Sequence, residues 1–249
     1  MNAAPNWLTT RPIAHRGLHN KAKGVIENTA SAARAAIEGG YAIECDVQLS
    51  ADGEAVVFHD FTLERLTEGE GRVDARSASE LAAIAMRGTQ DRIITLGDWL
   101  GVLQGRAAAV IEIKTGFDGD SRLARRTVEV TKAYDGPFVL KSFDPHVLVM
   151  LREIAPEIAR GIIAMNAYDY DDYVGLSAAE KHALANLLHF QETQPHFLSW
   201  RVGDLPSAAP FLCRSQLGLP VMAWTVRTPD DRVLAKAHAD QMVFEGFRP

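Results

Sequence analysis

Cysteine is scarce in this sequence, which carries only Cys45 and Cys213 among its 249 residues. Two thiols so far apart provide neither a disulfide framework nor the paired spacing of a zinc site. We expect both to be small, buried, apolar residues of a protein from a reducing compartment. The fold must therefore be held together by an ordinary hydrophobic core, for which the chain is long enough.

Long apolar runs are also missing. No stretch approaches the roughly 18 consecutive apolar residues that a membrane-spanning helix needs. The N-terminal segment MNAAPNWLTTRP lacks the basic start and apolar centre of a secretory signal. These absences predict a cytoplasmic protein without a membrane span.

Excess positive charge is a third absence, since 26 Lys and Arg stand against 32 Asp and Glu, a formal net charge of −6. Nucleic-acid binders concentrate Lys and Arg to replace counterions, so we expect no nucleic-acid partner. Any phosphate that this protein binds must be held by a local cluster of charge. The 47% hydrophobic and 23% charged residues are typical of a globular protein and compatible with a homo-oligomer.

Short runs rich in Val, Ile and Phe alternate with segments of helical periodicity, a pattern that predicts a parallel sheet. Nine runs are expected to be strands, namely residues 12–16, 42–49, 55–59, 108–114, 138–143, 160–164, 197–200, 221–226 and 242–245. Helix signals lie between several of them. Thr95 precedes an apolar i, i+3, i+4, i+7 stripe, Asp144-Pro145 suits a helix start, and Gly39-Gly40 suits a helix end.

One strand is surplus to a closed eight-stranded barrel, and the turn at residues 50–54 identifies it. This turn is too short for the crossover that parallel neighbours need, so residues 55–59 should return antiparallel to 42–49 as a hairpin arm. Eight parallel strands then remain. They predict a (β/α)8 TIM barrel over a single domain of residues 1–249, with an open doubly wound sheet as the alternative. The long polar segment 61–94 is expected to be an inserted subdomain or lid.

Charged residues stand inside or at the ends of four predicted strands, where apolar residues are the rule. The four blocks are Ala14-His15-Arg16-Gly17, Ile43-Glu44-Cys45-Asp46, Phe58-His59-Asp60 and Ile111-Glu112-Ile113-Lys114. Isolated buried charges are costly, so such groups must pair with one another or with a metal. The carboxyl ends of barrel strands are also where barrel active sites lie.

The spacing of the carboxylates indicates a metal site. Glu44 and Asp46 are two residues apart on one strand and leave the same face. Glu112 and Lys114 repeat that spacing on another strand. Three carboxylates without thiolates or a tight histidine pair favour a hard divalent cation, Mg²⁺ or Ca²⁺, over zinc. A buried ion-pair network with Arg16 and Lys114, of purely structural use, is the alternative.

Two of the eight histidines, His15 and His59, fall on strand ends beside these carboxylates. One neutral and one protonated imidazole can act as general base and general acid across a phosphorus atom. Arg16 and Lys114 would hold the nonbridging oxygens. The residue types together predict phosphoryl chemistry.

The same residues form a pattern that resembles the glycerophosphodiester phosphodiesterase family over nearly the whole chain. The motifs are His15-Arg16-Gly17, Glu27-Asn28-Thr29, Glu44-Cys45-Asp46-Val47, Asp52-Gly53-Glu54-Ala55-Val56-Val57-Phe58-His59-Asp60, Glu112-Ile113-Lys114, Ser142-Phe143 and Trp224-Thr225-Val226. Their order and spacing make the resemblance specific. The sequence departs from the family at Ile26, where proline is usual, and at Phe244-Glu245-Gly246, where the last strand commonly ends in Thr-Asp-x-Pro.

The resemblance implies a barrel of the phosphatidylinositol-phospholipase-C-like type that cleaves glycerophosphodiesters to sn-glycerol 3-phosphate and an alcohol. It implies that the glycerol 2-hydroxyl attacks phosphorus and that water then opens the cyclic phosphate. The implied roles are catalytic for His15 and His59, metal-binding for Glu44, Asp46 and Glu112, and phosphate-binding for Arg16 and Lys114. Glu27 and Trp224 are further candidates for substrate binding, and a place in the barrel core is the alternative for Trp224.

Two other functions are open to the same residues. A lyase would stop at the cyclic phosphate, and it would need the same side chains. A barrel without catalytic activity that merely binds an organic phosphate should have lost a histidine or a metal carboxylate, and none is lost here.

Overall fold

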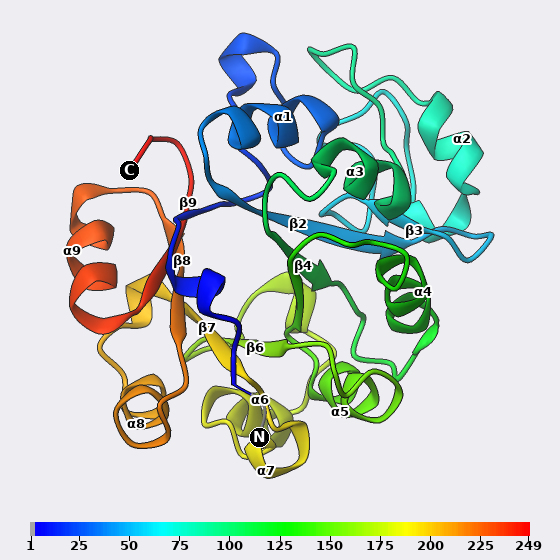
Figure 1. Ribbon diagram of the computed structural model, residues 1–249. Helices are drawn as coiled ribbons and strands as arrows, with labels where there is room; N and C mark the ends of the chain where they lie inside the picture. The colour runs from blue at the N-terminus through cyan, green and yellow to red at the C-terminus, as the bar shows by residue number, and fades with distance from the viewer. Residues whose placement is uncertain (1–2) are drawn as a thin grey trace. The chain divides into compact units, whose positions relative to one another are not determined.

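The computed structural model describes residues 3–249, which form two compact units. The N-terminal unit comprises Ile13–Lys114 and Ser121–Phe138. The C-terminal unit comprises Val139–Pro249, the short segment Thr115–Asp120 and the chain before Ile13. Each unit contributes parallel strands and the helices that follow them (Figure 1).

The N-terminal unit is built around β2 (Ala42–Leu49), whose first seven residues are all buried. Two strands run parallel to it, β1 (Ile13–Ala14) in the register Ile13 to Ala42 and β4 (Ala109–Ile113) in the register Asp46 to Glu112. The short β3 (Ala55–Val57) pairs antiparallel to β2, with Val57 opposite Val47. The predicted hairpin arm is therefore confirmed, although its strand ends at Val57 rather than His59.

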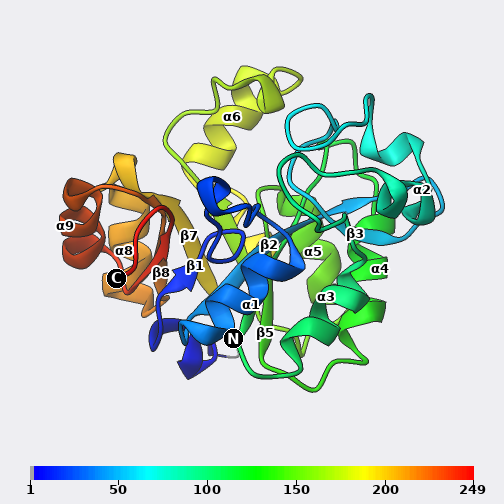
Figure 2. The same ribbon diagram turned by 90° about the horizontal axis from the view of Figure 1, so that it is seen from above.

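Helices of this unit begin at polar caps. Thr29 and Thr95 each accept a backbone hydrogen bond from the third residue after them, and Ser77 forms a complete capping box with Glu80. Gly39 caps the end of the first long helix, as predicted. The helices are η2 (Lys21–Lys23), α1 (Ala30–Glu38), η3 (Val73–Ala75), α2 (Ala78–Ala83), α3 (Leu96–Leu103) and α4 (Arg122–Thr131). Figure 2 shows α1, α3 and α4 in succession, with α3 in contact with both of the others.

The segment 61–94 packs through its own apolar side chains. Leu63, Leu81 and Ile93 are fully or almost fully buried and join a cluster that also includes Phe58, the residue after β3. Ile26, at the position where proline was expected, belongs to the same cluster and is 3% exposed. Burial of this apolar surface attaches the segment to β3 and to the loop before α1.

The C-terminal unit contains five parallel strands, each paired with the next along the chain. The strands are β5 (Phe138–Ser142), β6 (Arg160–Ala164), β7 (Phe197–Arg201), β8 (Val221–Val226) and β9 (Gln241–Phe244). The helices are η1 (Asn6–Thr9), α5 (Pro145–Ile154), η4 (Asp171–Tyr173), α6 (Ala178–Ala185), α7 (Phe190–Thr193), η5 (Val202–Asp204), α8 (Ala208–Leu217) and α9 (Pro229–His238). Asp144 caps α5, as predicted, because its side chain accepts from the backbone N–H of His146.

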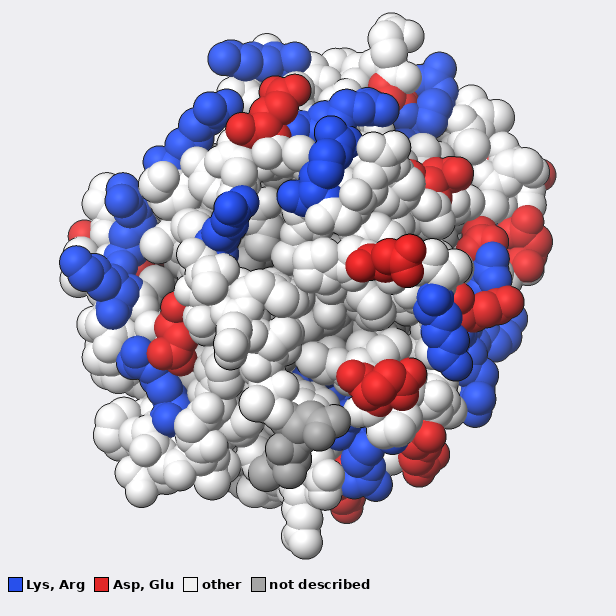
Figure 3. Space-filling model, in the orientation of Figure 1, with Lys and Arg blue, Asp and Glu red and all other residues white. Residues whose placement is uncertain are grey.

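Eight parallel strands alternating with helices, plus the antiparallel β3, give the chain the α/β fold of a TIM barrel. This confirms the fold class predicted from the sequence. Cys45 and Cys213 are both buried thiols that belong to no disulfide, as expected. Across residues 3–249, every helix is too short or too polar to cross a membrane. Figure 3 shows basic and acidic side chains lying among one another on one face of the molecule.

Candidate active site

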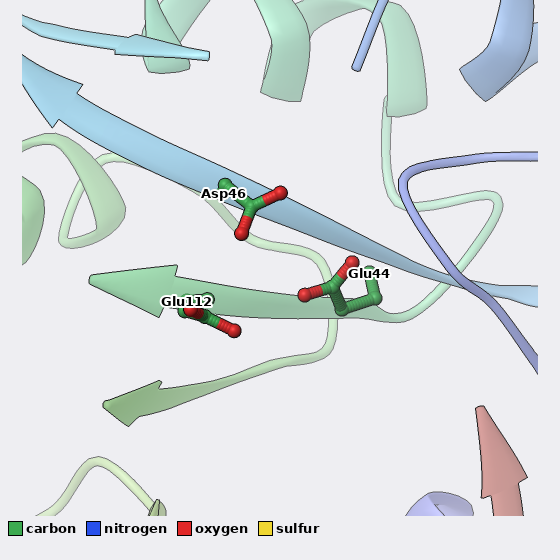
Figure 4. Close-up of side chains that lie close together, drawn as sticks. All are labelled: Glu44, Asp46 and Glu112. Atoms are coloured by element: carbon green, nitrogen blue, oxygen red, sulfur yellow. The ribbon is translucent and has the colours of Figure 1, made fainter. Parts of the chain in front are cut away.

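Three buried carboxylates converge on one side of β2 and β4. Figure 4 shows Glu44 and Asp46 on β2 with their carboxylates turned toward Glu112 on β4. One oxygen from each lies within 4.8 Å of the others, and the residues are 0%, 1% and 6% exposed, respectively. The alternation of side chains along a strand explains the grouping, since Glu44 and Asp46 share one face of β2 and the buried Cys45 between them belongs to the other.

Each carboxylate also meets a basic residue or a backbone N–H. The backbone N–H of Arg16 donates to Glu44 Oε2 at 2.9 Å, and Arg16 Nε lies 3.3 Å from Asp46 Oδ2. Lys114 Nζ lies 3.3 Å from Glu112 Oε1. Three carboxylates facing two cationic side chains suit a hard divalent cation as a further partner, because such a cation prefers oxygen ligands.

The charges of the neighbours keep Asp46 ionised. Burial by itself would raise the pKa of its carboxyl. His59, Arg16 and Lys114 outweigh burial and hold that pKa well below its usual range, with a smaller contribution from His15. A carboxylate that stays charged in a buried position is a competent metal ligand over the whole neutral pH range.

The turn after β1 places His15 and Arg16 beside the carboxylates. Arg16 and Gly17 adopt φ values of 55° and 82°, so the chain turns sharply where the strand ends. Gly17 is required here because a Cβ would lie 2.7 Å from the Cβ of Ala32 and 2.8 Å from its carbonyl carbon. His15 is 8% exposed.

His59 follows β3 and is held at three points. Its Nδ1 lies 2.7 Å from Asp60 Oδ1, and its backbone carbonyl accepts from Gln48 Nε2 at 2.8 Å. Its Nε2 lies 3.3 Å from Lys114 Nζ. The carboxylate favours the tautomer with the proton on Nδ1, which leaves the lone pair of Nε2 on the side of Lys114.

Glu27 forms ion pairs with two arginines. Its Oε1 accepts from Arg16 Nη1 at 2.6 Å and from Arg65 Nη2 at 2.8 Å. Burial would raise the pKa of Glu27, but Arg65 and Arg16 outweigh it and lower the pKa to about 2. Burial likewise opposes the charge of Arg16, yet Asp46 and Glu27 raise its pKa above the usual value. These ion pairs fix the guanidinium of Arg16 next to the carboxylates.

Trp224 lies on β8 in the C-terminal unit, apart in the chain from the residues above. Its indole Nε1 donates to the carbonyl of Ser199 at 2.9 Å. The centroid of its ring lies 5.5 Å from the centroid of the Phe143 ring, in an edge-on arrangement. Phe244, at the end of β9, is buried against Phe247. A contact between Trp224 and substrate remains a prediction.

Sequence reasoning gave no site role to three residues that hold the site together. Asn28 is bonded to Asp46, Asp60 to His59, and Arg65 to both Asp60 and Glu27. The first two stand inside motifs that the sequence displays, Glu27-Asn28-Thr29 and the His-Asp block. Arg65 falls in the polar segment 61–94, where nothing distinguishes it from other exposed arginines.

The comparisons with known proteins agree on one family. The model of the glycerophosphoryl diester phosphodiesterase family matches residues 15–244. A glycerophosphodiester phosphodiesterase from Caldanaerobacter subterraneus subsp. tengcongensis is 32% identical over 166 residues, which is 63% of this chain and 67% of that protein. Glycerophosphodiester phosphodiesterase 1 from Bos taurus is 26% identical over 91% of this chain and 74% of its own length.

Solved structures are similar over almost the entire chain. A phosphodiesterase from Oleispira antarctica, in complex with the product sn-glycerol-3-phosphate, has a TM-score of 0.75 at 25% identity and covers 96% of this chain and 94% of its own. A putative glycerophosphoryl diester phosphodiesterase from Silicibacter pomeroyi has the same fold, with a TM-score of 0.76 at 22% identity over 94% of this chain and 89% of its own. The chain belongs to the glycerophosphoryl diester phosphodiesterase family, and its activity is the hydrolysis of glycerophosphodiesters.

Proposed function

We propose that this enzyme hydrolyses glycerophosphodiesters to sn-glycerol 3-phosphate and an alcohol, with one divalent cation and with His15 and His59 as the acid–base pair. The observation that carries the proposal is the convergence of Glu44, Asp46 and Glu112 on one point. Its supports are the two basic side chains beside these carboxylates and the product seen in the Oleispira antarctica relative.

Arg16 and Lys114 would bind the phosphate. Both cationic groups lie within 3.3 Å of a carboxylate of the proposed metal site, so a phosphate there meets positive charge on two sides. The fork of Arg16 can bind two oxygens and Lys114 acts as a point charge. The Glu27 carboxylate already holds Arg16, so we assign it the orientation of that guanidinium rather than direct contact with phosphate.

Glu44, Asp46 and Glu112 would hold the cation. Mg²⁺ and Ca²⁺ fit the donor set, because all three ligands are carboxylate oxygens without sulfur or nitrogen. When bound, the cation would neutralise negative charge that develops on the phosphoryl oxygens.

The histidines would move protons in two stages. In the first, Nε2 of His59 takes the proton from the glycerol 2-hydroxyl while its oxygen bonds to phosphorus, and protonated His15 gives a proton to the departing alcohol. In the second, His15 takes a proton from water, whose oxygen bonds to phosphorus and opens the cyclic phosphate. His59 then returns its proton to the glycerol oxygen. Asp60, 2.7 Å from Nδ1, would stabilise the imidazolium between the two stages.

The test is a panel of glycerophosphocholine, glycerophosphoethanolamine, glycerophosphoinositol and bulkier sugar esters. Each is assayed with excess EDTA and after addition of Mg²⁺ or Ca²⁺. We expect release of sn-glycerol 3-phosphate that stops with EDTA and returns with metal. Full activity in excess chelator would overturn the metal-binding role of the three carboxylates.

Phosphorus NMR of the same reactions separates hydrolase from lyase. A hydrolase gives a cyclic phosphate that appears transiently, if at all, and is converted to the monoester. Persistence of the cyclic product after the diester is consumed would instead identify a lyase on the same residues.

A further inference from the structure

Arg65, in the segment 61–94, contacts two carboxylates that each hold a residue of the proposed site in place. We propose that Arg65 is a positioning residue, which aligns His59 through Asp60 and Arg16 through Glu27. The inference rests on the proposed function and gives the segment a role in it: to supply this guanidinium.

The guanidinium of Arg65 bridges two carboxylates with all of its nitrogens. Its Nε and Nη2 donate to Asp60, the latter to Oδ1 at 2.8 Å. Its Nη1 and Nη2 donate to Glu27, at 3.1 Å to Oε2 and 2.8 Å to Oε1. The planar fork of arginine can make both bidentate contacts at once, which the single ammonium of lysine cannot.

Each of the two carboxylates continues to a residue of the proposed mechanism. Asp60 Oδ1 lies 2.7 Å from His59 Nδ1, and Glu27 Oε1 accepts from Arg16 Nη1 at 2.6 Å. One continuous series of hydrogen bonds therefore joins the acid–base histidine to the phosphate-binding arginine. Arg65 lies at the centre of this series. Removal of its guanidinium would therefore loosen both His59 and Arg16.

The backbone around Arg65 is anchored. Leu63 is 0% exposed and Leu66 is 5% exposed, both within the apolar cluster beneath the segment. Thr67, also buried, donates its hydroxyl proton to the carbonyl of Leu63 at 2.8 Å. A long side chain on such a support can be held in one orientation at a smaller entropic cost than on a free loop.

Exposure limits what Arg65 adds to stability. Its side chain is 47% exposed, so water partly screens its ion pairs with the less exposed Glu27 and Asp60. Arg87 of the same segment provides the comparison, since its side chain is 49% exposed and pairs with Glu68 at 3.0 Å. Arg87 and Arg65 are similarly exposed, but Glu68 is 59% exposed, whereas Glu27 and Asp60 are 14% and 21% exposed and contact Arg16 and His59.

The kinetic test compares R65A and R65K with the matched control R87A, in the full-length enzyme with glycerophosphocholine and saturating Mg²⁺. We expect R65A to lower kcat about 10- to 100-fold because His59 is misaligned. We also expect it to raise KM, because a displaced Arg16 binds the phosphate of the substrate less well. R65K should recover part of one effect, because lysine can reach one carboxylate. R87A should stay within about twofold of wild type in both constants. Thermal unfolding checks that R65A, which also loses its ion pairs with Glu27 and Asp60, is still folded at the assay temperature. Wild-type kcat and KM in R65A would overturn the proposal.

A second measurement is independent of turnover. Long-range ¹H–¹⁵N NMR of the histidine rings reports the tautomer of His59 in the metal-free protein. We expect the Nδ1–H form in wild type and R87A, and a mixture of tautomers in R65A. An unchanged His59 signal in R65A would refute the claim that Arg65 aligns His59 through Asp60. If wild-type enzyme cleaves no glycerophosphodiester, the proposed function fails, while this signal still supports or refutes the positioning role of Arg65.

Discussion

Asn28 and Asp46 are joined by two hydrogen bonds in opposite directions. The Asn28 Nδ2 donates to Asp46 Oδ2 at 2.9 Å, and its Oδ1 accepts from the backbone N–H of Asp46 at 3.2 Å. Asn28 is 3% exposed and has a φ of 59°, a left-handed conformation that asparagine tolerates better than most residues. The side chain therefore fixes both the strand and the carboxylate of a proposed metal ligand.

Loss of this amide should weaken metal binding. We expect Asn28→Gly to lower the affinity for Mg²⁺ or Ca²⁺ by about 10- to 100-fold, because partners of metal ligands orient them for binding. Glycine adopts the positive φ without strain, so the change removes the side chain alone. Isothermal titration calorimetry measures the affinity, with Asn186→Ala at the end of α6 as a control. Equal affinities in the two variants would contradict the role.

Removal of either histidine should stop catalysis without preventing metal binding. We expect His15→Ala and His59→Ala to lower kcat by about 10²- to 10⁴-fold, the usual contribution of a general acid or base. Neither change removes a carboxylate, so calorimetric metal affinity should stay close to that of wild type. His238→Ala, at the end of α9, is the matched control. A rate like that of wild type in either His15→Ala or His59→Ala would refute the acid–base assignment.

Gly17 is expected to be intolerant of substitution. Gly17→Ala would add a Cβ at a φ of 82° and against Ala32, whereas Gly53→Ala meets a similar φ of 83° with nothing within 4 Å. Backbone strain alone should cost about 1–2 kcal/mol in the free energy of unfolding. The clash should make Gly17→Ala more destabilising, and displacement of Arg16 should also raise KM. Urea unfolding and steady-state kinetics check both effects, and equal losses in the two variants would argue against a close approach at Gly17.

Glu27 should stabilise the fold above its unfolded pKa and cease to do so in acid. Its folded pKa is about 2 and its pKa in the unfolded chain is about 4.5, so its contribution is present above about pH 4.5 and is lost as pH falls toward 2. Between these values the loss approaches ~1.4 kcal/mol per pH unit. The difference in unfolding free energy between wild type and Glu27→Gln should therefore shrink from about pH 5 to about pH 3. A constant difference would show that Arg65 and Arg16 do not lower this pKa.

The sequence predicted those parts of the molecule that depend on local pattern. Period-two alternation around Cys45 predicted that Glu44 and Asp46 share a face, and the short turn before Ala55 predicted an antiparallel arm. Both are seen, because strand geometry and turn length leave few alternatives.

Such local patterns could not predict contacts between segments that are distant in the chain. Arg65 and Glu27 are 38 positions apart in the chain, and their pairing depends on how the apolar cluster around Leu63 places the segment 61–94. A polar stretch shows which residues are hydrophilic, but it does not show which carboxylate an arginine will meet. For the same reason Asn28, although part of a displayed motif, could not be paired with Asp46 before the fold was known.

The antiparallel pairing of β3 with β2 also limits which insertions and deletions the sequence can accept. Val57 lies opposite Val47, and Phe58 donates its backbone N–H to the carbonyl of Asp46 at 3.1 Å, so the register of this hairpin sets where His59 emerges. A slip of one residue would turn the arm over and send the imidazole to the opposite face. The turn at residues 50–54 carries none of the proposed catalytic groups, and Ala51 and Asp52 in it are exposed. These two positions should therefore tolerate substitution far better than the turn tolerates insertions or deletions.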